Sequence, residues 1–169
     1  MKIKQKAELR EKCKKIKLVL TDVDGVLTDG GMYYSEKGEV MKKFNTKDGM
    51  AVELLSKKNI KTILITKEKS IIAKKRSEKI NASEIYLNVR DKQKELQKIM
   101  KKYNIKSFEI AYVGDDVNDI EVMKKVGISF TPSDGNYAVK QISYNICVCK
   151  GGEGVLREVA DLLLSFHDD

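Results

Sequence analysis

Several residue types are scarce in this sequence of 169 residues, which has no tryptophan, one proline, one histidine and three cysteines. A single proline excludes a proline-rich linker, and an odd number of cysteines does not fit a disulfide framework. The lone histidine, His167, stands near the end of the printed sequence, which disfavours phosphohistidine and Ser-His mechanisms. No run approaches the roughly 18 apolar residues of a membrane span, and no apolar run follows the charges at the start, as in a secretory signal. We therefore expect a soluble, cytoplasmic protein that does not bind membranes.

Positive charge is in excess, with 33 Lys and Arg residues against 25 Asp and Glu residues and a net charge of +8. The excess is concentrated in residues 1–17, which hold eight basic residues and two glutamates. A nucleic-acid-binding surface would interleave aromatic side chains with the lysines, and this segment has none. We therefore expect residues 1–15 to form a solvated, basic helical extension, and we expect no nucleic-acid partner.

After residue 16, short β-branched runs alternate with segments of helical period. The strand-like runs are 16–21, 60–66, 84–87, 109–113 and 127–130, and apolar stripes mark 91–103 and 155–166 as amphipathic helices. This alternation predicts an α/β fold, a doubly wound parallel sheet with helices on both faces. We expect one domain over residues 16–169, with a β-hairpin insert at 31–44 whose turn is formed by Glu36, Lys37 and Gly38.

Acidic residues follow two of the predicted strands at the point where each strand ends. Asp22 and Asp24 come after the first strand, and Asp115 and Asp119 come after the strand at 109–113. The carboxyl ends of parallel strands meet at one edge of the sheet, where ligands bind. Carboxylates gathered there would repel one another unless a cation lay among them, and such ligands suit Mg²⁺. The sequence therefore predicts a magnesium site at this edge.

A less specific interpretation is that these aspartates only cap the helices that follow them. The Asp22-Val-Asp-Gly25 motif alone does not separate the two interpretations. Thr66, at the end of another strand, and Lys92, after a further one, add phosphate-binding groups at matching positions. An anionic carboxylate approaches an anionic phosphate only where cations offset the charge, so the whole set favours phosphoryl chemistry.

These motifs resemble those of the haloacid dehalogenase superfamily of phosphohydrolases, over nearly the whole chain after residue 16. The resemblance implies that Asp22 is a nucleophile that forms an aspartyl-phosphate. It implies that Asp24 protonates the leaving alcohol and then deprotonates the attacking water, and that Thr66 and Lys92 hold the phosphoryl oxygens. The implied Mg²⁺ ligands are Asp22, the backbone carbonyl of Asp24 and Asp115, with Asp119 and Asp116 in support.

A narrower resemblance is to the small phosphatases of 3-deoxy-2-ulosonic acid phosphates. It is carried by residues 22–30, the hairpin, 44–49, Arg76, 91–92 and the glycine-rich tail 151–158. Members of this group lack a cap domain and are typically homotetramers in which hairpins pack together and a neighbouring subunit closes the active site. The same assembly is implied here, the alternative being a hairpin packed on its own domain. The implied substrate-binding residues are Asn45, Thr46, Lys47, Asp48, Gly49, Glu53, Glu68, Lys69 and Arg76.

Departures from the eight-carbon members of this group bear on the substrate. Those members usually have Thr-Gly-Arg where this chain has Thr66-Lys67-Glu68, and often have Arg in place of Glu53. Nine-carbon members resemble this chain more closely, and a carboxylate accepts hydrogen bonds from sugar hydroxyls. We therefore favour a nine-carbon 9-phosphate of the sialic acid type, with 3-deoxy-D-manno-octulosonate 8-phosphate as the alternative. Lys67 in place of glycine also leaves open that this chain is a noncatalytic paralogue with a role in oligomerisation or regulation.

Other features of the sequence carry weaker interpretations. A phosphate-accepting receiver domain has a similar set of residues in a different order. There the acidic pair and the phosphorylated Asp both precede the Thr and the Lys, whereas in this chain the second acidic cluster follows the Lys. Cys147 and Cys149, on one face of a predicted strand, lack the further ligands of a zinc site and are expected to be buried apolar residues. Lys150 and Arg157 have two interpretations. They either reach the active site of an adjacent subunit and bind the carboxylate of the sugar there, or they are surface residues without a role in binding.

Overall fold

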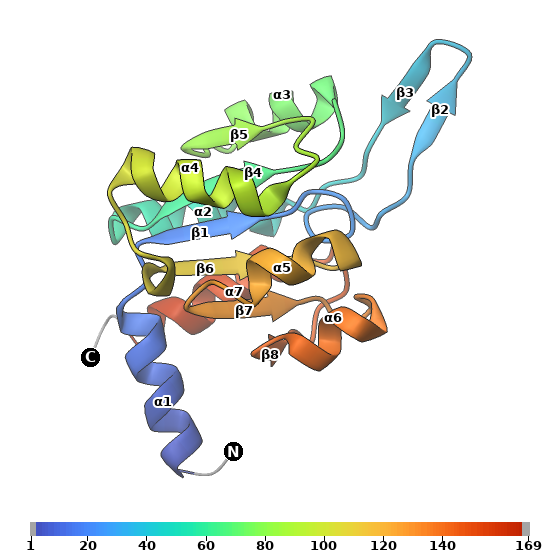
Figure 1. Ribbon diagram of the computed structural model, residues 1–169. Coiled ribbons are helices and arrows are strands. Elements are labelled where there is room, and N and C mark those ends of the chain that lie inside the picture. Colours follow the sequence, from blue (N-terminus) through green and yellow to red (C-terminus); the bar gives the residue numbers. More distant parts are fainter. Residues whose placement is uncertain (1–2, 167–169) are drawn as a thin grey trace.

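The computed structural model describes residues 3–166, and the side chains of residues 7–166. This part of the chain contains a parallel sheet of six strands in the order β5-β4-β1-β6-β7-β8 (Figure 1). The strands are β1 (Leu18–Thr21), β4 (Lys61–Ile65), β5 (Glu84–Tyr86), β6 (Ile110–Val113), β7 (Ile128–Thr131) and β8 (Asn145–Ile146). The predicted parallel sheet is confirmed, with β8 as an additional short edge strand.

Helices cover both faces of the sheet because strand side chains alternate between two apolar clusters. Val19 of β1 belongs to one cluster, whereas Leu18 and Leu20 belong to the other. The first cluster is covered by α1 (Ile3–Lys14), α2 (Thr46–Lys57), α3 (Ile71–Lys79) and α7 (Val155–Leu164). The second is covered by α4 (Lys92–Tyr103), α5 (Ile120–Met123) and α6 (Tyr137–Ile142), with short 3₁₀ turns at Ser107–Glu109 and Val117–Asp119. The doubly wound architecture is therefore confirmed.

The predicted hairpin is present and stands away from the sheet (Figure 1). Its strands, β2 (Tyr33–Ser35) and β3 (Gly38–Met41), are antiparallel, and a bridge between Thr28 and Phe44 joins the two arms at the base. Apolar side chains are exposed along it, among them Tyr34 at 62% and Val40 at 54%. The hairpin thus exposes apolar side chains, while Glu39 and Lys42 near its base contact the domain.

Two expectations about local structure are corrected. Helix α1 is not solvated on all sides, because Leu9 and Cys13 are buried in the cluster that also contains α7. Cys147 and Cys149 do not lie in a strand; they follow the end of β8, Cys147 buried and Cys149 half-buried. His167 lies outside the described residues.

The register of the parallel strands determines where the loops emerge. Thr21, the last residue of β1, is aligned with Leu64 of β4 and with Val113 of β6. The chain therefore leaves these three strands at one edge of the sheet, on either side of the central strand β1. Within residues 3–166, no helix is long and apolar enough to cross a membrane.

Candidate active site

Three strand ends bring the expected site residues to this edge. The backbone N–H of Asp22 donates to the carbonyl of Val113 (2.9 Å), which ties the residue after β1 to the end of β6. The N–H of Thr66 donates in the same way to Tyr86 at the end of β5 (2.9 Å). These bonds continue the sheet by one residue, so the side chains that follow the strands are placed by the rigid core rather than by mobile loops.

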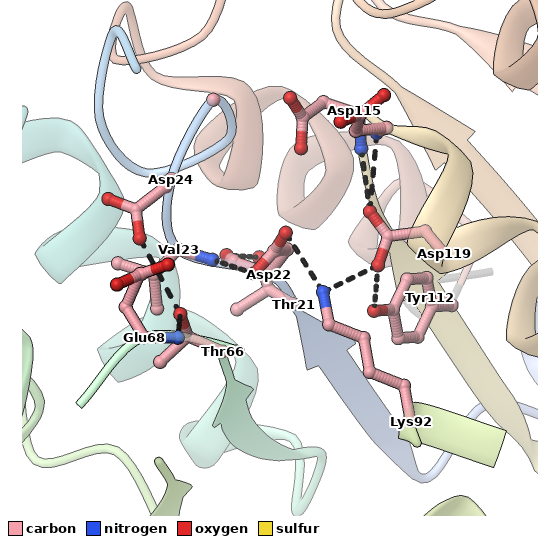
Figure 2. A network of polar contacts seen from close by, with 12 residues as sticks. Thr21, Asp22, Val23, Asp24, Thr66, Glu68, Lys92, Tyr112, Asp115 and Asp119 are labelled. Atoms are coloured by element: carbon pink, nitrogen blue, oxygen red, sulfur yellow. Dashed lines mark hydrogen bonds and ion pairs between the residues drawn. The ribbon is translucent and has the colours of Figure 1, made fainter. Parts of the chain in front are cut away.

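Asp22, Asp115 and Asp119 form an acidic cluster in which one carboxylate oxygen from each lies within 4.8 Å of the others. Lys92 extends from the start of α4 into this cluster (Figure 2). Its Nζ lies 2.9 Å from Asp22 Oδ2 and 2.6 Å from Asp119 Oδ1. Burial opposes the charge of Lys92, but the neighbouring Asp22 and Asp119 raise its pKa, so it remains an ammonium.

Burial raises the pKa of Asp22 to about 7, even though Lys92 opposes the shift. One of its oxygens, Oδ1, accepts a hydrogen bond from the N–H of Val23 (2.7 Å), which fixes the direction of the carboxyl group. The other oxygen contacts Lys92. Asp22 is therefore an oriented carboxyl group whose charged form needs more positive charge nearby than Lys92 supplies.

Asp119 has both carboxylate oxygens occupied by donors. Its Oδ1 accepts from Lys92 and from the buried hydroxyl of Tyr112 (2.6 Å), and its Oδ2 accepts from the N–H groups of Asp115 (3.1 Å) and Asp116 (3.4 Å) (Figure 2). With four donors in place, Asp119 orients Lys92 and the loop that carries Asp115.

Asp115 is the least satisfied member of the cluster. Its Oδ1 is buried and has no hydrogen-bond partner among the described residues. Burial raises its pKa to about 8, and the charges of Asp22 and Asp119 add to the shift. Gly25, at φ +85°, passes so close that a Cβ there would lie 2.1 Å from Asp115 Oδ2. A glycine at this position thus allows the loop after β1 to approach the Asp115 carboxylate.

The chemistry of this cluster fits a divalent cation. Three neighbouring carboxylates face one ammonium, and the orphaned oxygen of Asp115 is a ligand atom without a partner. A hard cation among these oxygens would supply the missing positive charge and lower the pKa values of Asp22 and Asp115. The cavity beside them is lined by Asp22, Asp24, Thr66, Lys67, Glu68, Asp115, Asp116, Val117 and Asn118.

Asp24 lies on the opposite side of this cavity from Asp115 (Figure 2), and each of its oxygens has a donor. Lys42 Nζ donates to Oδ1 (2.5 Å), and the hydroxyl of Thr66 lies 3.5 Å from Oδ2. The Lys42 side chain is fully buried and also contacts Glu39 Oε1 (2.7 Å). Lys42 is not among the site residues expected from the sequence, since nothing in the local pattern distinguishes it from the other lysines.

The expected substrate-binding residues are dispersed in the folded chain. Glu68 lines the cavity, and its N–H donates to Thr66 Oγ1 (3.0 Å). Lys67 also lines it and does not have the positive φ that favours glycine, so replacing glycine there causes no backbone strain. Lys69 is exposed and does not belong to the lining.

A second group of these residues lies along a groove between α2 and α3. Thr46, Gly49, Glu53 and Arg76 line this groove, which is separate from the cavity at Asp22. Glu53 is exposed and forms an ion pair with Lys57 one turn further along α2 (2.7 Å). Within one chain, therefore, Glu53 is not next to the acidic cluster.

The remaining residues of the set connect α2 with the glycine-rich tail. Asn45 caps α2 and donates from Nδ2 to the carbonyl of Gly152 (3.3 Å), while a Cβ at Gly154 would lie 3.4 Å from Cδ of Lys47. Asp48 is buried, and its Oδ1 accepts from the N–H of Arg157 at the start of α7 (3.1 Å). These contacts give Asn45, Lys47 and Asp48 a structural role in joining two helices.

The tail itself packs against the loop after β1. A Cβ at Gly151 would lie 2.2 Å from the carbonyl oxygen of Gly25, so this position requires glycine. Glu158 accepts from the N–H groups of Val148 and Cys149 (2.8 and 2.9 Å). Arg157 forms an exposed ion pair with Asp161 (2.7 Å). The tail therefore supports the loop that carries Asp24.

Comparisons with known proteins agree with this geometry. A family model described as haloacid dehalogenase-like hydrolase matches residues 8–159. A 3-deoxy-D-manno-octulosonate 8-phosphate phosphatase from Haemophilus influenzae is 31% identical over 156 residues, which are 92% of this chain and 87% of the relative. The protein of the same name from Escherichia coli K12 is 34% identical over 158 residues, 94% and 84% of the two chains.

Among solved structures, a 3-deoxy-D-manno-octulosonate 8-phosphate phosphatase from Moraxella catarrhalis superposes with a TM-score of 0.91 at 32% identity. The match covers 94% of this chain and 91% of that one, and that structure is a complex with a magnesium ion, a phosphate ion and a KDO molecule. A hydrolase of the same superfamily from Legionella pneumophila gives a TM-score of 0.94 at 32% identity, over 97% and 90% of the chains.

Proposed function

The chain belongs to the haloacid dehalogenase-like hydrolases, and on that premise we propose that it hydrolyses the phosphate monoester of a 3-deoxy-2-ulosonic acid. It is a phosphoric monoester hydrolase that uses Mg²⁺ and acts on a sugar phosphate. The observation that carries the proposal is the arrangement of Lys92 between Asp22 and Asp119, beside the orphaned carboxylate oxygen of Asp115. This arrangement supports a site for a metal ion and a phosphate group together.

In the first step, a carboxylate oxygen of Asp22 attacks the phosphorus atom. The bond between phosphorus and the sugar oxygen breaks, its electron pair goes to that oxygen, and the carboxyl of Asp24 supplies the proton. The product is an aspartyl-phosphate on Asp22 and a free sugar acid. Lys92 and Thr66 hold the phosphoryl oxygens and offset their charge during the transfer.

In the second step, the Asp24 carboxylate takes a proton from water, and the resulting hydroxide attacks the phosphorus atom of the aspartyl-phosphate. The bond to Asp22 breaks, inorganic phosphate leaves, and both carboxyl groups return to their starting states. The residues assigned to Mg²⁺ are Asp22, the backbone carbonyl of Asp24 and Asp115, with Asp119 and Asp116 in support. A Mg²⁺ ion held by these residues would offset the charge of the phosphoryl oxygens that approach Asp22.

For the sugar, we assign 3-deoxy-D-manno-octulosonate 8-phosphate as the preferred substrate. The relatives named above support this assignment, and it replaces the preference for a nine-carbon ester that Glu53 and Glu68 indicated. Of these two glutamates, Glu53 gives the nine-carbon ester little support within one chain, since it pairs with Lys57 outside the cavity. Glu68, at the cavity edge beside Thr66, keeps a nine-carbon 9-phosphate as the second candidate.

For the assembly, we propose a homotetramer formed through the hairpins, with the active site closed by a neighbouring subunit. The exposed side chains of Tyr34 and Val40 support it, because a two-stranded hairpin with apolar faces in water is marginally stable on its own. Placement of Glu53 and Arg76 in an open groove also fits a surface that a second subunit completes.

The test is phosphate release from the eight-carbon ester and from two nine-carbon esters, each with Mg²⁺ and with EDTA. Turnover that needs Mg²⁺, favours the eight-carbon ester and disappears in Asp22→Asn is expected. Asp161→Asn, the same change at an exposed carboxylate, serves as the control. Preference for a nine-carbon ester would move the assignment to the second candidate, and no turnover of any ester would refute the proposed function.

A further inference from the structure

A fully buried lysine stands directly behind the expected proton donor. Lys42 follows β3 at the base of the hairpin, and its side chain has 0% exposure. Its Nζ lies 2.5 Å from Asp24 Oδ1 and 2.7 Å from Glu39 Oε1. Burying an ammonium group is costly unless carboxylates pair with it, and here two do. A charge enclosed in this way has a defined position, unlike that of an exposed lysine.

The contact continues beyond Lys42 into a second helix. Glu39 Oε2 accepts a hydrogen bond from the hydroxyl of Ser70 (2.5 Å), and Ser70 Oγ also caps α3 by accepting from the N–H of Ala73 (3.2 Å). A line of polar contacts thus runs from Asp24 through Lys42 and Glu39 to the buried Ser70. It joins the loop after β1, the hairpin and the start of α3.

The two oxygens of Asp24 are made unequal by these contacts. Oδ1 faces Lys42, and an ammonium has donors but no acceptor, so a proton on Oδ1 would have no acceptor there. Oδ2 faces Thr66 and the cavity. Because Glu39 offsets the charge of Lys42, Asp24 lies beside an ion pair rather than beside a lone positive charge.

We propose that Lys42 is a positioning residue that fixes the Asp24 carboxyl group, so that Oδ2 delivers the proton to the leaving oxygen of the sugar. The proposal rests on the proposed function, in which Asp24 is the proton donor. In the step itself, the bond between phosphorus and the sugar oxygen breaks, the oxygen keeps the electron pair, and the proton passes from Asp24 Oδ2 to it. Without Lys42, Asp24 rotates about its side-chain bonds, and proton transfer in the required geometry becomes rarer.

The leaving group provides a test that a merely structural role would not pass. An alkoxide from a sugar leaves only when it is protonated, whereas p-nitrophenolate leaves without a proton. We would compare Lys42→Met with the wild-type protein in the first turnover, following release of the sugar from the eight-carbon ester and of p-nitrophenol from p-nitrophenyl phosphate. We expect sugar release to fall by about 10- to 100-fold and p-nitrophenol release to change by less than about threefold.

The matched control is Lys43→Met, the same substitution at the next residue, where the side chain is 66% exposed and lies 3.5 Å from Asp29. It is expected to leave both reactions unchanged. Lys42→Arg keeps a donor towards Asp24 and is expected to restore much of the sugar reaction. Glu39→Gln, one contact further from Asp24, provides a milder variant should Lys42→Met fail to fold, and is expected to show the same selective loss.

The outcomes separate the proposal from the function on which it rests. Wild-type protein without turnover of either ester would refute the proposed function itself. With an active wild type, equal losses on both esters or no loss on either would refute a positioning role for Lys42. A raised KM for the sugar ester, with an unchanged first-turnover rate, would assign Lys42 to substrate binding and also overturn the proposal.

Discussion

The ammonium group of Lys92 lies 2.9 Å from the carboxylate of Asp22, and both side chains are almost completely buried. The same ammonium contacts Asp119 at 2.6 Å, so one positive charge serves two carboxylates inside the protein. An ion pair in this position is costly to break from one side, because the remaining charges cannot be solvated. Lys92 therefore contributes to the stability of the cluster, in addition to the phosphate binding that we propose for it.

Lys92→Met tests this double role. We expect turnover to disappear and the free energy of unfolding in EDTA to fall by about 3–5 kcal/mol, as measured by urea denaturation. Lys94→Met is the control, since its side chain is 78% exposed and lies 3.5 Å from Asp91, and it is expected to change stability by less than about 1 kcal/mol. Equal stability of the two variants would contradict a structural contribution of Lys92.

Asp115→Asn is expected to change stability in opposite directions with and without metal. Without Mg²⁺, the variant loses a carboxyl whose pKa is raised to about 8 by burial, so its thermal midpoint equals or exceeds that of the wild type. Mg²⁺ at 100 times its Kd adds about 2.7 kcal/mol to the free energy of unfolding of the wild type. Each kcal/mol raises the thermal midpoint of a protein of this size by about 2–4 °C. The midpoint of Asp115→Asn stays unchanged.

Asp116→Asn is the comparison for this experiment, because Asp116 is the adjacent, exposed carboxylate. Because Asp116 is assigned only a supporting role at the ion, Asp116→Asn is expected to keep most of the wild-type response to Mg²⁺, in thermal unfolding and in titration calorimetry. If Mg²⁺ raised the midpoint of Asp115→Asn but not that of Asp116→Asn, the ion would be held by Asp116 and not by Asp115.

The pH dependence of stability is predicted to contain a contribution from Asp48. Burial raises its pKa to about 6, although the N–H groups of Arg157 and Leu156 and the charge of Arg76 oppose the shift. Between about pH 4 and 6 the folded state therefore holds more protons on this carboxyl than the unfolded chain does, and the free energy of unfolding falls as pH rises.

Asp48→Asn removes this contribution. Relative to Asp48→Asn, the wild type is expected to lose roughly 2–3 kcal/mol of unfolding free energy between pH 4 and pH 7. Urea denaturation at a series of pH values measures it, and Asp161→Asn, at an exposed carboxylate, provides the reference. Parallel pH curves for the wild type and Asp48→Asn would contradict the buried carboxyl as the source.

The double variant Tyr34→Lys with Val40→Lys is predicted to weaken assembly through the hairpin. Both side chains are exposed in the single chain, and burying each in an interface contributes about 1.5–3 kcal/mol. Their replacement by lysine is expected to shift sedimentation toward smaller species. Val148→Lys, at a residue that is 86% exposed near α7, leaves the distribution unchanged if association uses the hairpin.

Much of the fold is predictable because local patterns and the tertiary structure agree. Continuous apolar runs in β1 and β6 specify strands buried on both faces, and the acidic residues after them necessarily share one edge. The sequence therefore predicts that Asp22 and Asp115 lie in one cluster, as they do in the structure.

Lys42 shows where sequence reasoning fails. Its burial arises from the approach of the hairpin base to the loop after β1, and nothing in residues 38–44 reports that approach. For the group from Asn45 to Gly49, substrate binding stays a prediction. Its resemblance to substrate-binding segments is a property of residue identity, whereas its contacts with Gly152 and Arg157 depend on how α2 meets α7.

The central position of β1 has a consequence for the order in which the site is built on the ribosome. One neighbour, β4, is synthesised by residue 65, but the other, β6, is complete only at residue 113. Until then the backbone N–H of Asp22 lacks the carbonyl of Val113, to which it donates in the finished protein. A nascent chain therefore carries Asp22, the nucleophile that we propose, long before it has the strand that fixes this residue. The acidic cluster proposed to hold the metal ion therefore forms only late in synthesis, when Asp115 and Asp119 follow β6.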